Sequence, residues 1–443
     1  MRVMNFVFLI AILIAPAWAA ETADADRFWP SWRGPSNTGV SPAGDPPIEW
    51  SETKNIRWKV AIPGEGQGTP IIWGDRVFVT SAIDTGEESA ASAPSTAPSG
   101  RRRHPGGVSA SSTLQHVVFA LSRKSGEILW RTTANREKPH EGRHPTGTFA
   151  SNSAVTDGER LYAYFGSRGL YALDFDGNLL WERDFGDMRK RMGFGEGSSP
   201  ALFGDTLVVI WDHEDQSFLV ALDVNDGSER WRTDRDEFTS WTTPIIVESE
   251  GRAQVVTVAT TEVRSYDLET GEQLWESRGV TLNAIPSPVY ADGIVYLMSG
   301  FRGSALEAVK LSAAEGSLED SGAVLWRYDQ DTPYVSSPLL YEGGLYFLKS
   351  NNPILTALDA KSGEPLYSRQ RVAGLTSIYS SMVGAAGRVY ITDRKGSTVV
   401  IDAGSEYKVL ATNTLDDAFD ASAAIVGSEI YLRGANLYCI AAD

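Results

Sequence analysis

The stretch Ala221-Leu222-Asp223-Val224-Asn225-Asp226-Gly227-Ser228-Glu229-Arg230-Trp231 decides the fold, because its pattern recurs along the chain. A small or apolar pair is followed by an acid, a turn with glycine, and an aromatic residue seven or eight positions after the acid. Other copies run from Ala120 to Trp130, Ala172 to Trp181, Ser265 to Trp275 and Ala357 to Tyr367, and degenerate copies run from Ala308 to Trp326 (with an insertion) and from Val400 to Leu410. Self-similarity at a fixed period indicates a repeat architecture.

Each copy predicts a β-hairpin, because the glycine supplies the positive φ that a tight turn needs. Two more short strands precede the motif, for example Ser199-Pro200-Ala201-Leu202 and Thr206–Trp211, with Gly204 between them. Four short antiparallel strands in a period of roughly 40–50 residues are typical of a propeller blade.

The number of blades follows from counting two sets of strands. The tryptophan-type positions are 58, 130, 181, 231, 275, 326, 367 and 410, and the acid-motif strands also number eight if Leu437-Tyr438-Cys439-Ile440 is the last. The first strand has no motif before it, and the last has no tryptophan strand after it. We therefore expect an all-β, eight-bladed β-propeller of four-stranded antiparallel blades, closed by pairing of the N-terminal strand with the C-terminal blade. An open solenoid would leave exposed sheet edges.

The N-terminus has the pattern of a secretory signal peptide. Arg2 precedes an apolar run over residues 3–15, and Ala17-Trp18-Ala19 offers small residues for cleavage, so we assign residues 1–20 to the signal peptide. An uncleaved membrane anchor is the alternative. We expect a periplasmic or secreted protein with no lipid anchor and no transmembrane segment.

Three further ranges complete the predicted organisation. Residues 21–55 are expected to form an N-terminal extension that packs on the propeller, and residues 56–443 to form the propeller. Within blade one, residues 85–113 are rich in Ser, Ala, Pro and Gly and include Arg101-Arg102-Arg103. This composition predicts a disordered insertion.

Charge and cysteine content exclude several function classes. The formal net charge is −17, which disfavours binding to nucleic acid or to an anionic lipid surface. Cys439 is the single cysteine, so no internal disulfide is expected.

The repeat resembles the pyrroloquinoline-quinone (PQQ) repeat, which builds quinoprotein alcohol dehydrogenases and the non-catalytic barrel-assembly factor BamB. The N-terminal Trp29-Pro30-Ser31-Trp32-Arg33-Gly34-Pro35 is similar to a group of secreted bacterial PQQ-like propellers without assigned activity. In this family the repeat aromatic docks on the neighbouring blade. The resemblance therefore implies a structural role for Trp58, Trp130, Trp181, Trp231, Trp275, Trp326 and Tyr367.

A quinoprotein dehydrogenase would need more than the repeat. The resemblance implies an adjacent Cys-Cys disulfide against the quinone and Ca²⁺ held by Glu, Asn and Asp. One cysteine excludes the disulfide and a haem attachment motif. We expect no cofactor, and PQQ with Ca²⁺ is disfavoured.

His140-Glu141-Gly142-Arg143-His144 matches the H-E-x-x-H pattern of zinc proteases, which requires a helix. Pro139, Pro145 and Gly142 argue against a helix. A loop pair of histidines that binds a metal or ligand in another geometry stays open, but we predict no metal site.

Blade geometry directs the search for a ligand site to one face. The loops after the tryptophan strands and those between the second and third strands emerge together, and such irregular loops on a regular scaffold often carry binding. The candidate ligand-binding residues on this face are His140, His144, Arg168, Asp212, His213, Trp241, Arg302, Tyr334, Asn351 and Arg394.

Two functions remain open for this face. The first is a non-catalytic periplasmic or extracellular binding or assembly scaffold for a protein, peptide or polymeric ligand, which we favour because no catalytic residue is identified. The alternative is a quinoprotein-type oxidoreductase or another enzyme whose site lies in the funnel.

Overall fold

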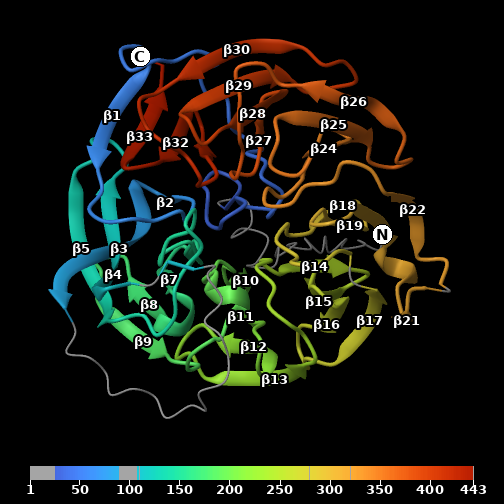
Figure 1. Ribbon diagram of the computed structural model, residues 1–443, viewed down its shortest axis with the longest axis horizontal. Coiled ribbons are helices and arrows are strands. Elements are labelled where there is room, and N and C mark those ends of the chain that lie inside the picture. The colour runs from blue at the N-terminus through green and yellow to red at the C-terminus, as the bar shows by residue number, and fades with distance from the viewer. Residues whose placement is uncertain (1–24, 89–106, 109, 279, 320, 443) are drawn as a thin grey trace, which may run out of the picture.

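The computed structural model describes residues 25–88, 107–108, 110–278, 280–319 and 321–442. They form eight antiparallel sheets arranged in a ring (Figure 1), which confirms the predicted eight-bladed propeller. In seven of the sheets the first strand in sequence lies innermost, and in the closing sheet β31 does, since these inner strands contact one another from blade to blade.

The strands of each blade follow one another from the axis outward. They are β2 (Ile71–Trp73), β3 (Arg76–Glu88), β4 (Ser112–Ser122) and β5 (Ile128–Glu137); β6 (Val155–Thr156), β7 (Arg160–Tyr164), β8 (Leu170–Asp174) and β9 (Leu179–Arg183); β10 (Ala201–Phe203), β11 (Thr206–Trp211), β12 (Ser217–Asp223) and β13 (Glu229–Arg235); β14 (Ile245–Ser249), β15 (Arg252–Thr257), β16 (Glu262–Asp267) and β17 (Gln273–Arg278); β18 (Val289–Ala291), β19 (Ile294–Ser299), β20 (Ala305–Lys310) and β22 (Val324–Tyr328); β23 (Leu339–Tyr341), β24 (Gly344–Leu348), β25 (Ile354–Asp359) and β26 (Pro365–Arg371); β27 (Val383–Ala385), β28 (Arg388–Thr392), β29 (Ser397–Asp402) and β30 (Val409–Thr414); and β31 (Ala424–Val426), β32 (Glu429–Arg433), β33 (Asn436–Ala441) and β1 (Ile56–Ala61). Three short 3₁₀ helices, η1 (Gly166–Arg168), η2 (Arg191–Gly193) and η3 (Leu311–Ala313), lie in loops.

The hydrophobic core lies between the blades rather than inside any one of them. All six residues of β11 are buried, whereas the outer strand β13 alternates toward exposed positions. A middle strand has a neighbouring blade on both faces, so its sequence is continuously apolar. One core cluster joins Tyr162 and Leu170 of one blade to Leu207 and Trp211 of the next.

Five repeat tryptophans bind the hairpin of the following blade. The Trp231 indole Nε1 donates to the Leu268 carbonyl at 2.8 Å. A Cβ on Gly271, which has a φ of 74°, would lie 2.5 Å from a Trp231 ring carbon, so this glycine is required both by the turn and by the indole. The equivalent indole donors and carbonyl acceptors are Trp58 and Arg123 (2.9 Å), Trp130 and Phe175 (2.7 Å), Trp181 and Val224 (2.9 Å), and Trp326 and Lys361 (3.0 Å).

Within the described part of the chain, two repeat aromatics, Trp275 and Tyr367, do not donate to a hairpin carbonyl of the following blade. The insertion before β22 replaces the hairpin that Trp275 would meet, and its short strand β21 (Gly316–Ser317) pairs with β17 in parallel instead. The Trp275 Nε1 donates to Gln254 Oε1 of its own sheet at 2.9 Å. Tyr367 packs edge-on against Tyr407 with ring centroids 5.9 Å apart.

The ring closes where β1 pairs with β33, as predicted, with Trp58 opposite Cys439 (Figure 1). The buried carboxylate of Glu429 strengthens this junction: it accepts from Arg57 on β1 and, at 2.6 Å, from Arg123 Nε in the first blade. One acid thus joins both sides of the seam.

The N-terminal segment from residue 25 packs along the inner strands, and in Figure 1 it passes close to the centre of the ring. Trp29 forms a bridge with Ile72, and Val40 forms one with Gly384. The buried Arg33 guanidinium donates to the Met382 and Pro338 carbonyls, both at 2.8 Å. The predicted signal peptide at 1–20 lies outside the described residues.

Part of the range assigned to the predicted disordered insertion forms strand. Strand β3 continues to Glu88 and β4 begins at Ser112, so residues 85–88 and 112–113 are strand instead. Pairing of Glu88 with Ser112 extends the sheet beyond the apolar residues that the sequence pattern could detect. Residues 89–106 and 109 lie outside the described part of the chain.

Candidate functional site

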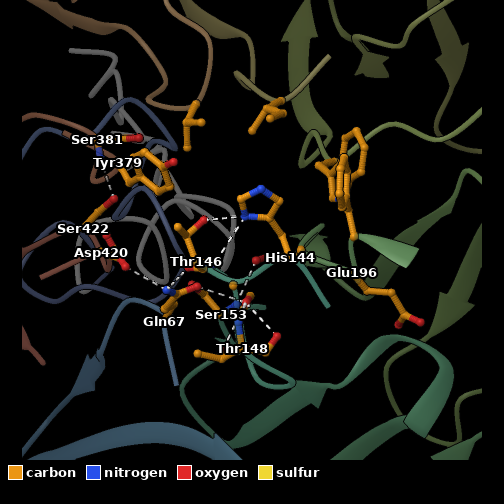
Figure 2. Close-up of a pocket in the computed structure, with 18 of the residues that line it drawn as sticks. Gln67, His144, Thr146, Thr148, Ser153, Glu196, Tyr379, Ser381, Asp420 and Ser422 are labelled. Atoms are coloured by element: carbon orange, nitrogen blue, oxygen red, sulfur yellow. Dashed lines mark hydrogen bonds between the residues drawn. The ribbon is translucent and has the colours of Figure 1, made fainter. Parts of the chain in front are cut away.

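A pocket with a volume of about 270 Å³ lies on the propeller axis. Each of the eight loops that enter an innermost strand contributes at least one lining residue. The lining comprises Trp32, Gln67, His144, Thr146, Gly147, Thr148, Ser151, Ser153, Phe194, Glu196, Gly197, Ser199, Trp241, Ile285, Tyr334, Val335, Tyr379, Ser381, Asp420 and Ser422. Figure 2 shows part of this lining.

Trp32 is the lining residue that does not come from these loops. Its neighbour Trp29 pairs with Ile72 of β2, and the Pro30 carbonyl accepts from the Thr156 amide at the far end of β6. The N-terminal segment therefore lies further along the axis than the loops, toward the hairpin face. Trp32 forms the floor of the pocket.

A ring of hydroxyl side chains surrounds the axis, with one member in each blade. In every link, a backbone N–H donates to the hydroxyl oxygen of the next blade's member. The seven links, at 2.7–3.0 Å, are Thr69 to Ser153, Ser153 to Ser199, Ser199 to Thr243, Thr243 to Ser287, Ser287 to Ser337, Ser337 to Ser381, and Ser381 to Ser422. The eighth link is open: Thr69 Oγ1 is buried and has no partner among the described residues.

A polar network fills one side of the pocket (Figure 2). Gln67 Nε2 donates to Asp420 Oδ2 at 2.9 Å and to the Thr146 carbonyl at 2.7 Å. Arg394 makes two bonds to the same carboxylate, through Nε at 2.5 Å and its other nitrogen at 3.1 Å. The hydrogen bond to Asp420 raises the pKa of Arg394. Asp420 is therefore a paired carboxylate.

Glu196 is the second carboxylate of the lining, and it is also engaged. Its two oxygens accept from the Ser167 amide and the Ser167 hydroxyl, each at 2.6 Å. In Figure 2 the Glu196 carboxylate points away from His144.

His144 presents one ring nitrogen to the pocket. The Thr146 amide donates to Nδ1 at 3.2 Å, and the Thr146 hydroxyl lies 2.7 Å from the same atom. Burial, with the Arg394 charge as a second cause, lowers the pKa of His144, so the ring is neutral at pH 7. Because Nδ1 accepts, the proton is on Nε2, which faces open space in Figure 2.

Three aromatic rings of the lining each have a partner behind them. Lys190 Nζ lies 5.4 Å from the Trp241 ring centroid, Phe301 stacks on Tyr334 at 4.7 Å, and the Arg394 guanidinium lies 4.2 Å from the Tyr379 centroid. The Trp241 indole also donates to the Gly195 carbonyl at 2.8 Å. These contacts fix the rings in place.

The structure brings together only some of the predicted ligand residues. His144, Trp241 and Tyr334 line the pocket. Arg394 lies behind Tyr379 and Asp420, and Asn351 Oδ1 accepts from the Val335 amide at 3.2 Å. Arg302 lies over the ring of its own neighbour Phe301.

The other four predicted residues lie elsewhere on the loop face. His140 and Arg168 line a separate small cavity of about 30 Å³. Asp212 is buried and ion-paired with Arg235 at 2.9 Å. His213 Nδ1 lies 3.1 Å from the Arg189 amide. Asp212 and His213 therefore support the loops around the pocket.

The H-E-x-x-H stretch is not helical, as the prolines predict. His140 Nδ1 lies 3.1 Å from Asp187 Oδ1, Glu141 accepts from the Lys190 amide at 2.8 Å, and His144 faces the axial pocket. Across the described residues, no group of three or more His, Cys, Asp and Glu side chains is arranged to hold a metal ion.

Several pocket residues were missed from the sequence, notably Trp32, Gln67 and the hydroxyl ring. A signal for part of the ring exists: Ser199-Pro200, Ser287-Pro288 and Ser337-Pro338 occupy the same phase of their repeats. Trp32 gives no such signal, because its position depends on where the N-terminal segment crosses the axis.

A known protein family matches most of the chain. The sequence profile of a family described as "Outer membrane protein assembly factor BamB" matches residues 114–192, 177–321 and 317–442. The chain belongs to this family. Membership in the BamB family agrees with the predicted PQQ-like repeat. No curated protein sequence matches the chain.

Solved structures similar to this BamB-family chain include a BamB protein and two dehydrogenases. BamB from Moraxella catarrhalis aligns over 87% of this chain and 98% of its own, with 14% identity and a TM-score of 0.55. A europium-containing methanol dehydrogenase aligns over 93% and 91%, with 11% identity and a TM-score of 0.63. The quinohemoprotein alcohol dehydrogenase ADHIIG from Pseudomonas putida HK5 aligns over 93% and 76%, with 11% identity and a TM-score of 0.56. These likenesses establish the shared fold alone.

Proposed function

We propose that this BamB-family propeller is a non-catalytic binding or assembly scaffold that acts in the periplasm or outside the cell. The axial pocket is its ligand site, and a protein, peptide or polymeric ligand enters it from the loop face. Family membership and the predicted signal peptide support this location. Among the described residues, no helix has the length and hydropathy of a membrane span.

One observation carries this proposal: the two carboxylates and the histidine of the pocket are already bonded to the protein. Asp420 is held by Arg394 and Gln67, Glu196 by Ser167, and His144 accepts through Nδ1 from Thr146. A general base or nucleophile needs an activating partner and a free lone pair toward the substrate. The pocket provides shape and a few fixed polar atoms, which is what binding requires.

The alternative, a quinoprotein oxidoreductase, requires residues that fit PQQ and Ca²⁺. The quinone carries three carboxylates, and the pocket lining includes no lysine or arginine to receive them. A calcium ion takes six to eight oxygen ligands, whereas both lining carboxylates already accept two or more bonds. Cys439 is buried in β33 opposite Trp58. These residues do not fit the cofactor.

Reconstitution separates the two functions. Purified protein is incubated with PQQ and Ca²⁺, desalted, and tested for quinone absorbance and for dye-linked oxidation of primary alcohols. We expect neither retained quinone nor dye reduction. Dye reduction that disappears in Glu196→Gln or His144→Phe would contradict the proposal.

Binding is tested with a phage-displayed random peptide library and a panel of neutral oligosaccharides. We expect an enriched binder whose affinity falls about tenfold, or about 1.4 kcal/mol, in Trp241→Ala. The matched control is Phe203→Ala, an exposed aromatic at the hairpin end of β10. A binder equally sensitive to both changes would place the site elsewhere.

A further inference from the structure

We propose that the axial pocket recognises a neutral sugar ring, so that the ligand is the end of a carbohydrate or glycan. This inference rests on the proposed binding function and names its ligand class. It follows from three properties of the lining: the ring faces, the charge and the hydrogen-bond donors.

The aromatic residues supply flat apolar walls. Lys190, Phe301 and Arg394, which cover one face each of Trp241, Tyr334 and Tyr379, do not belong to the pocket lining. These partners therefore lie behind the rings, and the half-buried rings turn their other side to the pocket. Trp32 adds a further ring at the floor. A ligand with a flat C–H surface packs on such rings.

Charge excludes the cationic ligands that aromatic pockets often bind. Trp241 and Tyr379 already have a cation behind them, which repels a second cation at the opposite face. Of the two lining carboxylates, Asp420 is ion-paired with Arg394, and the Glu196 carboxylate is bonded to Ser167 and points away from His144 (Figure 2).

Charge also disfavours an anion. The lining includes no lysine or arginine, and its histidine is neutral at pH 7. The net charge of the chain, −17, adds long-range repulsion. A neutral ligand remains.

The polar atoms of the pocket match hydroxyl groups. His144 offers Nε2–H. Four ring hydroxyls line the pocket at Ser153, Ser199, Ser381 and Ser422. Each accepts a backbone N–H, and among the described residues none donates its own proton to a protein acceptor. Each hydroxyl can therefore still donate and accept once, as a sugar hydroxyl does.

The size of the cavity favours one ring rather than a chain. Pockets for drug-sized ligands span roughly 300–1,000 Å³, and this pocket measures about 270 Å³. Trp32 at the floor prevents a polymer from passing through the axis. Only a terminal ring enters, and the remainder of the glycan would lie over the loop face.

A matched set of sugars tests charge directly. D-glucose, D-galactose, D-mannose and N-acetyl-D-glucosamine are titrated at pH 7, with D-glucosamine as the cationic and D-glucuronate as the anionic analogue of the same ring. Binding is measured by saturation-transfer NMR and by tryptophan fluorescence. We expect at least one neutral sugar to bind, and its charged analogues to bind at least tenfold more weakly.

Variants then place the bound sugar. Trp241→Ala and His144→Phe should each weaken binding about tenfold, while Phe203→Ala leaves it unchanged. Melting temperatures within a few degrees of the wild type verify folding, and either pocket variant alone suffices if the other unfolds.

The outcomes are distinct. The inference is overturned if no neutral sugar binds, if a charged analogue binds as tightly, or if both pocket variants bind normally. If a proline-rich or aromatic peptide binds instead, and Trp241→Ala weakens it, the sugar is wrong and the binding function stands. Dye reduction by the PQQ-loaded protein would overturn the binding function itself.

Discussion

The rim and the axis of the propeller are held by different contacts. At the rim, an indole such as Trp181 covers a glycine of the next blade and donates to a carbonyl. At the axis, a backbone N–H donates to a small hydroxyl of the next blade, and further out in the first blade the buried His116 on β4 lines the small cavity that also contains His140 and Arg168. The rim is therefore expected to provide pH-independent stability, whereas the axis keeps polar groups in place around a pocket.

Removing a rim contact should produce the largest effect. Trp181→Ala leaves a cavity between two blades, and such changes lower the free energy of unfolding by about 3–5 kcal/mol. Urea unfolding measures the loss. The control is Leu180→Ala, whose side chain lies on the same strand and is exposed. Equal effects of the two changes would contradict an apolar rim contact.

Acid should weaken the first blade, where His116 is buried. Burial, with the Arg168 charge as a second cause, lowers the pKa of His116 to about 4, below the unfolded value of about 6.5. Between these values the unfolded state binds more protons, so the free energy of unfolding falls as pH drops through this window, by about 3 kcal/mol in total.

His116→Phe should remove this pH dependence, as urea midpoints at pH 7 and pH 4.5 would show. Trp181→Ala should retain the wild-type dependence, because it changes the rim. If both variants keep it, His116 is not the titrating group.

Breaking one link of the hydroxyl ring should have a smaller effect. Ser337→Ala leaves the buried Ser287 N–H without its acceptor, which lowers the free energy of unfolding by about 1–3 kcal/mol. The neighbouring Ser336 is equally buried, but its hydroxyl has no partner among the described residues. Ser336→Ala is thus the matched control, and hydrogen exchange at the Ser287 amide should speed up only in Ser337→Ala.

Removing the hydroxyl at the open link should hardly change the free energy of unfolding. Thr69→Val removes a buried hydroxyl that bonds to no described residue, and it preserves the shape of the side chain. The free energy of unfolding should change by about 0.5 kcal/mol or less. A loss as large as that of Ser337→Ala would mean that Thr69 Oγ1 is bonded in solution.

The same contrast explains what the sequence could predict. The rim motif is visible because an acid, a glycine and a tryptophan at fixed spacing are uncommon together, as in Asp223, Gly227 and Trp231. The axial ring is hidden because serine and threonine are common and act here through backbone N–H groups. Loop positions indicated His144, Trp241 and Tyr334, but loop residues from eight blades and Trp32 meet only once the ring has closed.

Closure of the ring also determines when the protein can finish folding. Strand β1 begins the ring, yet its partner β33 comes after every other blade in the chain. During synthesis, β1 has to wait with an unpaired edge until the last strand is available. The ring therefore closes only after the whole chain is available, and a truncation of β33 would leave two exposed edges ready to join neighbouring molecules.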